Sequence, residues 1–304
     1  MTSNVSMVKK ETFVSGLGRM IGAEFLKLRK RQMTWVLLAI LTGSIVLVNL
    51  ILLAVSKAHI PSGNGTRLEK IQNLLGLPVA IPFTFELMSF FGVVLAIILV
   101  ASSMGNEYNW KTMRTALISS ESRFKFLVAK LVSLGVMILI GMLIGVVTGF
   151  VMSLITTGLG GYAYVFSFAT GSYVWAQFLQ FWRTFFIILP FSLLAFLMAI
   201  GGRSAMAGIA TGIGVFFLES IITTFMSLAS GWIAKVPAYL LNANVSAINA
   251  LNKLPEGFGG GAGTGGGATI ELPSLSHAFI ILSLYSVIFL FLSFYFFKKR
   301  DVTG

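Results

Sequence analysis

Residues 131–155 read LVSLGVMILIGMLIGVVTGFVMSLI, a run of 25 residues without a charged side chain. A helix of about 20 apolar residues crosses the roughly 30 Å hydrocarbon core of a bilayer, so this run predicts a transmembrane helix. Comparable stretches lie at 33–55, 83–104, 174–200, 204–229 and 276–297. All six are continuous apolar runs rather than the short alternating segments of a β-barrel, and helices satisfy their own backbone hydrogen bonds in lipid.

The composition of the whole chain agrees with this reading. Of 304 residues, 56% are hydrophobic and only 11% are charged, whereas a soluble chain carries roughly a quarter charged residues. We therefore predict an all-α polytopic membrane protein with an N-terminal segment (1–32), a six-span domain (33–297) and a basic tail (298–304). The chain contains no cysteine, which excludes disulfides, thiolate nucleophiles and thiolate metal sites.

The basic residues predict the orientation. The chain has 22 Lys and Arg against 10 Asp and Glu, a net charge of +12. Sixteen of the 22 fall on the side that holds both termini, five on the opposite side, and Arg183 lies within a span. By the positive-inside rule both termini are cytoplasmic, and we expect a multi-pass protein of the bacterial plasma membrane. Topology accounts for the excess charge, so no nucleic-acid partner is expected. The first span is longer than a signal-peptide core and is expected to remain as an anchor.

The segment 12–32 has the pattern of an amphipathic helix. Its apolar residues recur at helical spacing: Phe13, Leu17, Met20, Ile21, Phe25 and Leu28. Such a helix can lie in the membrane interface with its cations on anionic lipid; the alternative is a basic topology signal and nothing more.

Three segments are expected on the external side. Thr66 and Glu69 form a capping box for a short helix over 66–75. Leu241, Val245, Ile248 and Leu251 form the apolar stripe of a second helix, which either packs on the outer surface of the bundle or contacts a ligand. The glycine-rich residues 257–268 contain a G-x-G-x-x-G spacing, but no strand precedes it, so we interpret this segment as a flexible linker.

Between the second and third spans lies a polar loop, residues 106–123, with the sequence NEYNWKTMRTALISSESR. A solvated loop that obeys the positive-inside rule would explain its charges. It would not explain the apolar side chains of Trp110, Met113, Leu117 and Ile118, which need a partner surface if the loop stands clear of the bilayer.

This loop resembles the one that follows the second span in permease subunits of type-two ABC exporters. The residues that carry the resemblance are Glu107, Thr112, Leu117 and Arg123, followed by Ala129 and Lys130 at the start of the third span. The chain departs from the family pattern at Lys111, where Gly is common, and at Ser120-Glu121, where Pro is common.

The resemblance implies a cytoplasmic coupling helix that docks on a separate P-loop ATP-binding subunit. The contacts it implies are Glu107, Trp110, Thr112, Met113, Arg114, Leu117 and Arg123. It also implies a second permease, either another copy or a homologue, and two ATPases. The chain itself contains no G-x-x-x-x-G-K-[ST] motif, so ATP and Mg are expected in the partner, with no cofactor and no enzymatic activity in this chain.

Arg183 and Glu219 are the ionisable residues predicted deep within spans. Counted from the outer ends of their spans they lie at similar depth, so we expect them to form an ion pair; a contact with substrate is the alternative. Small residues at four-residue spacing predict close helix packing, within one subunit or at a dimer seam. They are Gly141, Gly145 and Gly149 in the third span, and Gly208 and Gly212 in the fifth. Pro190 is expected to kink the fourth span.

Two other classes of function fit the sequence less well than an exporter does. An intramembrane enzyme is disfavoured because the two histidines, His59 and His277, are far apart in sequence and form no metal or acid–base cluster with carboxylates. An ATP-independent channel or ion-coupled secondary transporter usually has several polar groups near the midplane and repeated halves, which the sequence lacks. The substrate stays open among lipids, hydrophobic peptides and amphiphilic drugs.

Overall fold

The structure is a computed structural model that describes residues 13–57, 74–77, 79–109, 123–161, 166, 168–227, 231–252 and 272–299. Among these residues, six helical segments are long and apolar enough to cross a membrane, and none forms a strand. The segments are α2 (Gln32–Lys57), the continuous stretch Ala80–Tyr108, α7 (Arg123–Gly160), α8 (Gly171–Gly202), α9 (Ala205–Ser227) and α11 (Leu275–Lys299). The chain is therefore an all-α polytopic membrane protein.

Each predicted span corresponds to one of these segments, but most helices extend beyond the predicted ends. The second span consists of α4 (Ala80–Leu87), one π-helical turn, η1 (Met88–Gly92), and α5 (Val93–Asn109). The third span begins at Arg123 rather than Leu131, because Phe126 and Leu127 are buried and continue the helix. Three predicted segments, 66–75, 110–122 and 257–268, lie wholly or mostly outside the described residues.

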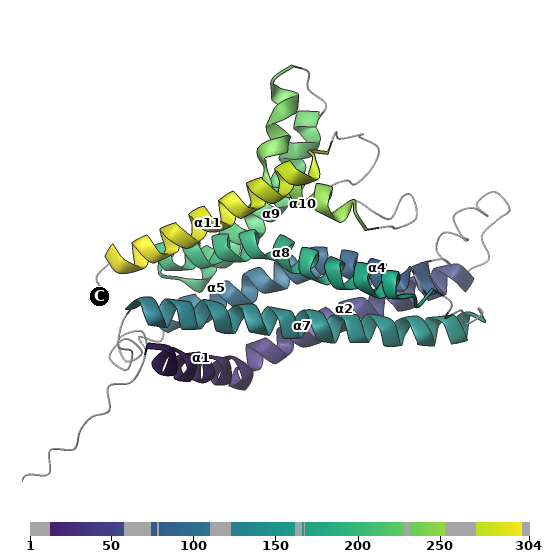
Figure 1. The fold of residues 1–304 in the computed structure, drawn as a ribbon, viewed down its shortest axis with the longest axis horizontal. Helices are drawn as coiled ribbons and strands as arrows, with labels where there is room; N and C mark the ends of the chain where they lie inside the picture. Colours follow the sequence, from purple (N-terminus) through teal and green to yellow (C-terminus); the bar gives the residue numbers. More distant parts are fainter. Residues whose placement is uncertain are drawn as a thin grey trace, which may run out of the picture.

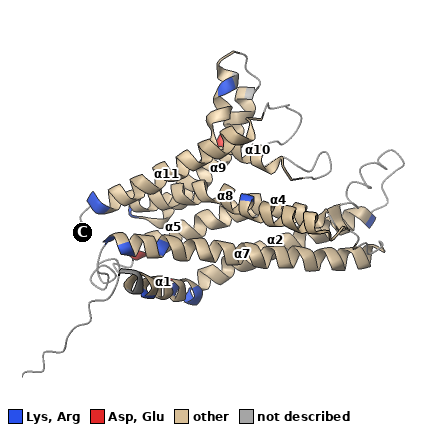
Figure 2. Cartoon of the chain, in the orientation of Figure 1, with Lys and Arg blue, Asp and Glu red and all other residues tan. Residues whose placement is uncertain are grey.

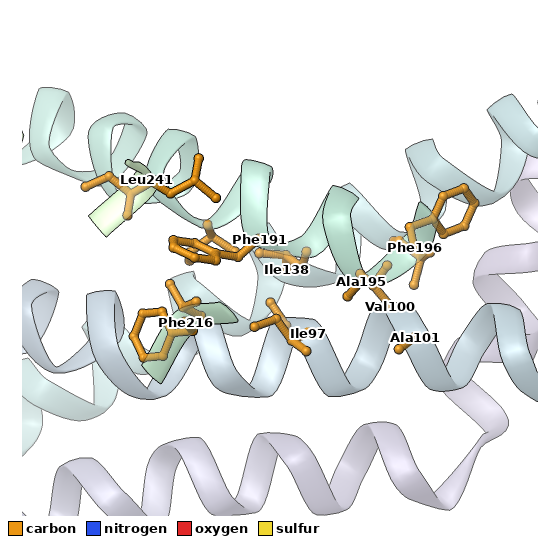
Figure 3. Packing of buried hydrophobic residues seen from close by; sticks show 14 of the residues in the cluster. Ile97, Val100, Ala101, Ile138, Phe191, Ala195, Phe196, Phe216 and Leu241 are labelled. Atoms are coloured by element: carbon orange, nitrogen blue, oxygen red, sulfur yellow. The ribbon is translucent and has the colours of Figure 1, made fainter. Parts of the chain in front are cut away.

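The helices form a bundle in which α8 is central. It packs against α5, α9 and α11, while α2 packs against α7 (Figure 1). The core between α5 and α8 is apolar: Figure 3 shows Ile97 of α5 near Phe191 and Ala195 of α8, and all three side chains are completely buried. Pro190 lies inside α8, where its missing N–H removes one helical hydrogen bond.

Four of the five predicted packing glycines lie at helix contacts. A Cβ atom at Gly208 would lie 2.6 Å from the carbonyl oxygen of Ala195, and one at Gly212 would lie 2.7 Å from Ile97. Gly145 and Gly149 are equally close to side chains of the second span. Gly141 differs, because a Cβ atom there would meet no atom within 4 Å. Gly141 therefore makes no close packing contact within the described part of this chain, and a contact at a dimer seam stays a prediction for it.

Three shorter helices complete the described fold: α1 (Phe13–Lys30), the 3₁₀-helix η2 (Ile233–Tyr239) and α10 (Leu241–Asn249). The α1 helix is amphipathic as predicted, with Leu28 buried against the bundle and the basic residues of its last turn exposed.

The prediction for α10 was only partly right. Every residue of α10 is buried among α8, α9 and α11, including its asparagines, whereas Leu251 of the predicted stripe lies beyond the end of the helix and is 39% exposed. Its asparagines can be buried because they form hydrogen bonds: the Nδ2 of Asn242 donates to the carbonyl of Phe216 at 2.6 Å, and that of Asn244 to the carbonyl of Leu240 at 2.6 Å.

Basic residues gather at one end of the bundle (Figure 2), which we call the basic end. It is formed by α1, the end of α5, the start of α7 and the end of α11 (Figure 1). Lys27, Arg29 and Lys30 lie in the last turn of α1, and Lys298 and Lys299 in the last turn of α11.

Candidate functional site

A buried cluster of charges joins three helices at the basic end. Lys130 of α7 is only 1% exposed. Its Nζ lies 3.0 Å from Oε2 of Glu24 on α1 and forms a second ion pair with Oε1 of Glu107, near the end of α5. The same Nζ lies 5.3 Å from the centre of the Phe126 ring. The two carboxylates are also buried, at 5% and 3% exposure, so a buried cation is enclosed by two buried anions.

The position of Glu24 in α1 explains why this cluster forms. Glu24 continues the apolar stripe of α1 between Ile21 and Leu28, so the face that packs on α7 carries a carboxylate within it. A buried charge is costly unless it is paired, and Lys130 supplies the pair. The hydroxyl of Ser133 fastens the same contact, donating to the carbonyl of Ile21 at 3.1 Å.

Glu24 also receives a second cation from the outer side of the helix. Lys27, one turn further along α1, pairs with its Oε1 while the lysine side chain remains 50% exposed. Burial by itself raises the pKa of Glu24, but the charges and hydrogen bonds of Lys130 and Lys27 outweigh it and hold the pKa below its ordinary value. Glu24 therefore stays ionised near neutral pH.

The cluster lies at the base of the 110–122 loop. Glu107 precedes the loop by three residues and Lys130 follows it by eight, so their ion pair joins the helices that enter and leave it. The start of α7 is also tied to the end of α11: the Phe126 and Phe297 rings stack with centroids 6.1 Å apart, and Arg123 Nη1 donates to the carbonyl of Lys298 at 3.4 Å. The helices on either side of residues 110–122 are thus fixed to each other and to α11.

The residues predicted to contact a partner fall into three groups. Trp110, Thr112, Met113, Arg114 and Leu117 lie outside the described residues. Arg123 is exposed at the start of α7, where a partner can reach it. Glu107 is buried, so its prediction as a contact residue is wrong: its carboxylate faces Lys130 inside the bundle.

The predicted ion pair between Arg183 and Glu219 is also wrong. Arg183 Nε donates to the carbonyl of Leu179 in its own helix at 3.3 Å. Glu219 accepts the first backbone N–H groups of α10, from Leu241 at 3.0 Å and from Asn242 at 2.9 Å.

The register of the α8–α9 hairpin explains the error. Arg183 lies 20 residues before Arg203, the residue at the tight turn, whereas Glu219 lies 15 residues after Ser204. The five-residue difference offsets the two side chains by about 7 Å along the helices. Counting from the outer ends concealed this offset, because α8 extends further outward than α9.

Polar groups also meet around α10, away from the basic end (Figure 1). Asn252 Nδ2 donates to Oε2 of Glu86 at 3.4 Å, and the hydroxyl of Ser89 donates to Oδ1 of Asn249 at 3.2 Å. Together with Glu219 these contacts fasten the α10 segment to the second and fifth spans. Within the described residues no group of three or more His, Cys, Asp or Glu could hold a metal ion.

The sequence contains a signal for the buried cluster that the spans and the loop motif do not reveal. Glu24 is an acidic residue at an apolar position of a basic helix, which is an unfavourable place unless a cation faces it. Lys130 similarly precedes an uncharged run of 25 residues. Reading these two exceptions together would have predicted the pair.

Comparison with known proteins gives a family but no activity. The uncharacterized protein YhcI of Bacillus subtilis (strain 168) is 25% identical over 218 residues, which cover 68% of this chain. They cover 64% of YhcI, so the match spans less than two thirds of that protein. A family model described as "Protein of unknown function (DUF2705)" matches residues 66–303, a region that includes Glu107 and Lys130. The chain therefore belongs to this family of proteins of unknown function.

Proposed function

We propose that this chain is the transmembrane permease subunit of an ATP-driven ABC exporter. The observation that carries the proposal is the Glu107–Lys130 ion pair, which joins the helices that precede and follow the 110–122 loop. Both residues belong to the motif that resembles the exporter permeases. A short loop with rigid ends and apolar side chains suits the transmission of force from a soluble motor.

The cluster suggests how a push on the loop would spread. Lys130 joins α1, α5 and α7 in one buried contact, so these three helices move together rather than separately. The interior of α5 packs on α8 and α9, through the close contacts of Gly208 and Gly212. A displacement at the basic end would then pass through the core to α10.

The proposal assigns the remaining parts of the complex as follows. The basic end faces the cytoplasm of a bacterial cell, and the chain lies in the plasma membrane. A separate P-loop subunit binds ATP and Mg, and this chain catalyses no reaction. Two permeases, a pair of copies or a pair of homologues, assemble with two ATPases to form the substrate path.

Co-expression with a P-loop ATPase encoded beside the gene tests the proposal. The wild-type chain is expected to co-purify with the ATPase, and Trp110→Ala or Leu117→Ala is expected to lose it. Trp232→Ala is the matched control, since Trp232 is 76% exposed just before η2, which packs on α9 and α10, away from the basic end (Figure 1). If the wild-type chain binds no such ATPase, or if all three variants bind it equally, the coupling role is wrong.

A further inference from the structure

An apolar groove lies between α1, α2, α5 and α7, with a volume of about 310 Å³. Its walls come almost wholly from side chains within the spans, including Leu41, Met88, Ala96, Leu99, Ile138 and Met142. A groove of this composition at membrane depth suits a hydrocarbon chain, since it offers almost no hydrogen-bonding partner to a polar ligand.

One end of the groove is polar and basic. Arg29, in the last turn of α1, lines this end together with Trp35, whose indole Nε1 donates to the Arg29 carbonyl at 2.8 Å. Lys27 and Lys30 lie in the same turn. Among the described residues, the Arg29 guanidinium has no hydrogen bond or ion pair, in contrast to Lys27, which pairs with Glu24. An exposed, unneutralised guanidinium therefore lies where the apolar groove opens.

Gly141 explains how the groove can exist along α7. A Cβ atom at this position would meet no atom within 4 Å, and Gly141 itself lines the groove. Its neighbours in the same stripe, Gly145 and Gly149, are instead filled by side chains of the second span. Two glycines of the stripe thus serve helix packing, while Gly141 leaves room for something else.

We propose that this groove binds one acyl chain of an anionic phospholipid from the surrounding membrane, with the phosphate at Arg29. The apolar walls provide the affinity for the chain, and the guanidinium provides the preference for a negative headgroup. Trp35, 56% exposed beside Arg29, has the amphipathic character that favours the headgroup level. The bound lipid would fill the space between α1, α2, α5 and α7, with Ile188 of α8 also lining the groove. This inference does not depend on the exporter proposal, because it holds for the chain alone.

Native mass spectrometry of the full chain, titrated with phosphatidylglycerol and with phosphatidylcholine of the same acyl chains, tests this site. The wild-type chain is expected to bind the first phosphatidylglycerol more tightly than the first phosphatidylcholine. Arg29→Gln should reduce that preference about fivefold, the effect of removing one basic residue at an anionic lipid surface. Gly141→Leu should fill the groove and abolish the tight binding of either lipid.

Gly135→Leu is the matched control, because Gly135 also lies on α7 with open space at its Cβ but does not line the groove. It is expected to bind lipid as the wild type does. The assignment is overturned by equal binding of the two lipids to the wild type, by unaltered binding to Gly141→Leu, or by equal loss in both glycine variants. A wild-type dimer that Gly141→Leu converts to monomer without a change in lipid binding would make the groove an interface between copies, and would also overturn it.

Discussion

Replacing Lys130 with methionine should destabilise the basic end of the bundle. The substitution keeps the length of the side chain but removes the cation, leaving the carboxylates of Glu24 and Glu107 buried without their shared partner. Breaking a buried ion pair by removing one partner costs about 3–5 kcal/mol, and here one cation serves two anions. We therefore expect the free energy of unfolding to fall by at least about 3 kcal/mol.

Thermal melting in detergent, followed by tryptophan fluorescence, measures this loss. A change of 1 kcal/mol moves Tm by about 2–4 °C in chains of 150–250 residues, so Lys130→Met should lower Tm by roughly 6 °C or more. Lys27→Met is the matched control: it also removes a lysine paired with Glu24, but one that is half exposed, so its effect should stay within about 1 kcal/mol.

A second variant separates lost charge pairing from lost packing. Combining Lys130→Met with Glu24→Gln and Glu107→Gln removes all three charges while keeping the shapes of the side chains. The combined variant should recover most of the lost Tm, because replacing a whole buried ion cluster by neutral groups is often nearly neutral. If Lys130→Met melts within about 2 °C of the wild type, or the combined variant melts no higher than Lys130→Met, the reasoning is refuted.

Three further predictions concern pH, packing and the α10 segment. The pKa of Glu24 is lowered in the folded protein, so ionised Glu24 stabilises the fold above its ordinary pKa of 4.5. This stabilisation is lost as the pH falls from 4.5 through the lowered pKa of the folded protein. Tm measured from pH 7 to pH 3 should show the loss in the wild type and a smaller loss in Glu24→Gln. Gly208→Ala should lower the free energy of unfolding by about 1–3 kcal/mol, because the new methyl group would lie 2.6 Å from a carbonyl oxygen of α8. Gly214→Ala is the control: no atom lies within 4 Å of its Cβ position, so the free energy of unfolding should stay unchanged or rise by up to about 1 kcal/mol. Equal melting temperatures of the two variants would contradict this prediction. Glu219→Ala should speed hydrogen exchange of the first two backbone amides of α10 about tenfold or more, because these amides donate to its carboxylate. Arg183→Gln should leave their exchange rates unchanged. An equal effect of both variants would instead support an ion pair between Arg183 and Glu219.

The sequence predicted the spans well because membrane helices depend on a property that is summed over many residues. A run such as 131–155 needs only its apolarity to cross a bilayer, and no tertiary contact changes that conclusion. The ends of the helices were less predictable. The charged residues Arg123 and Lys125 led to the prediction of a loop at the start of α7, although Phe126 and Leu127 are buried in the bundle.

The pairing of buried charges could not be derived from the depth of single residues. Two side chains on neighbouring helices meet only if their register and rotation agree, and the α8–α9 turn offsets Arg183 from Glu219 by more than one helical turn. Glu219 instead accepts a hydrogen bond at the N-terminus of α10, because the first backbone amides of a helix have no partner within the helix and attract a carboxylate. The sequence pattern predicted that helix, but not its burial beside Glu219.

Site-specific photo-crosslinking in intact membranes shows directly whether the 110–122 loop contacts a P-loop ATPase. A photoreactive phenylalanine at position 117 is compared with one at position 272, an exposed leucine just before α11, away from the basic end. If the loop contacts the ATPase, position 117 should give a covalent adduct with the ATPase and position 272 should give none. An adduct from neither position, or equal yields from both, would contradict this contact.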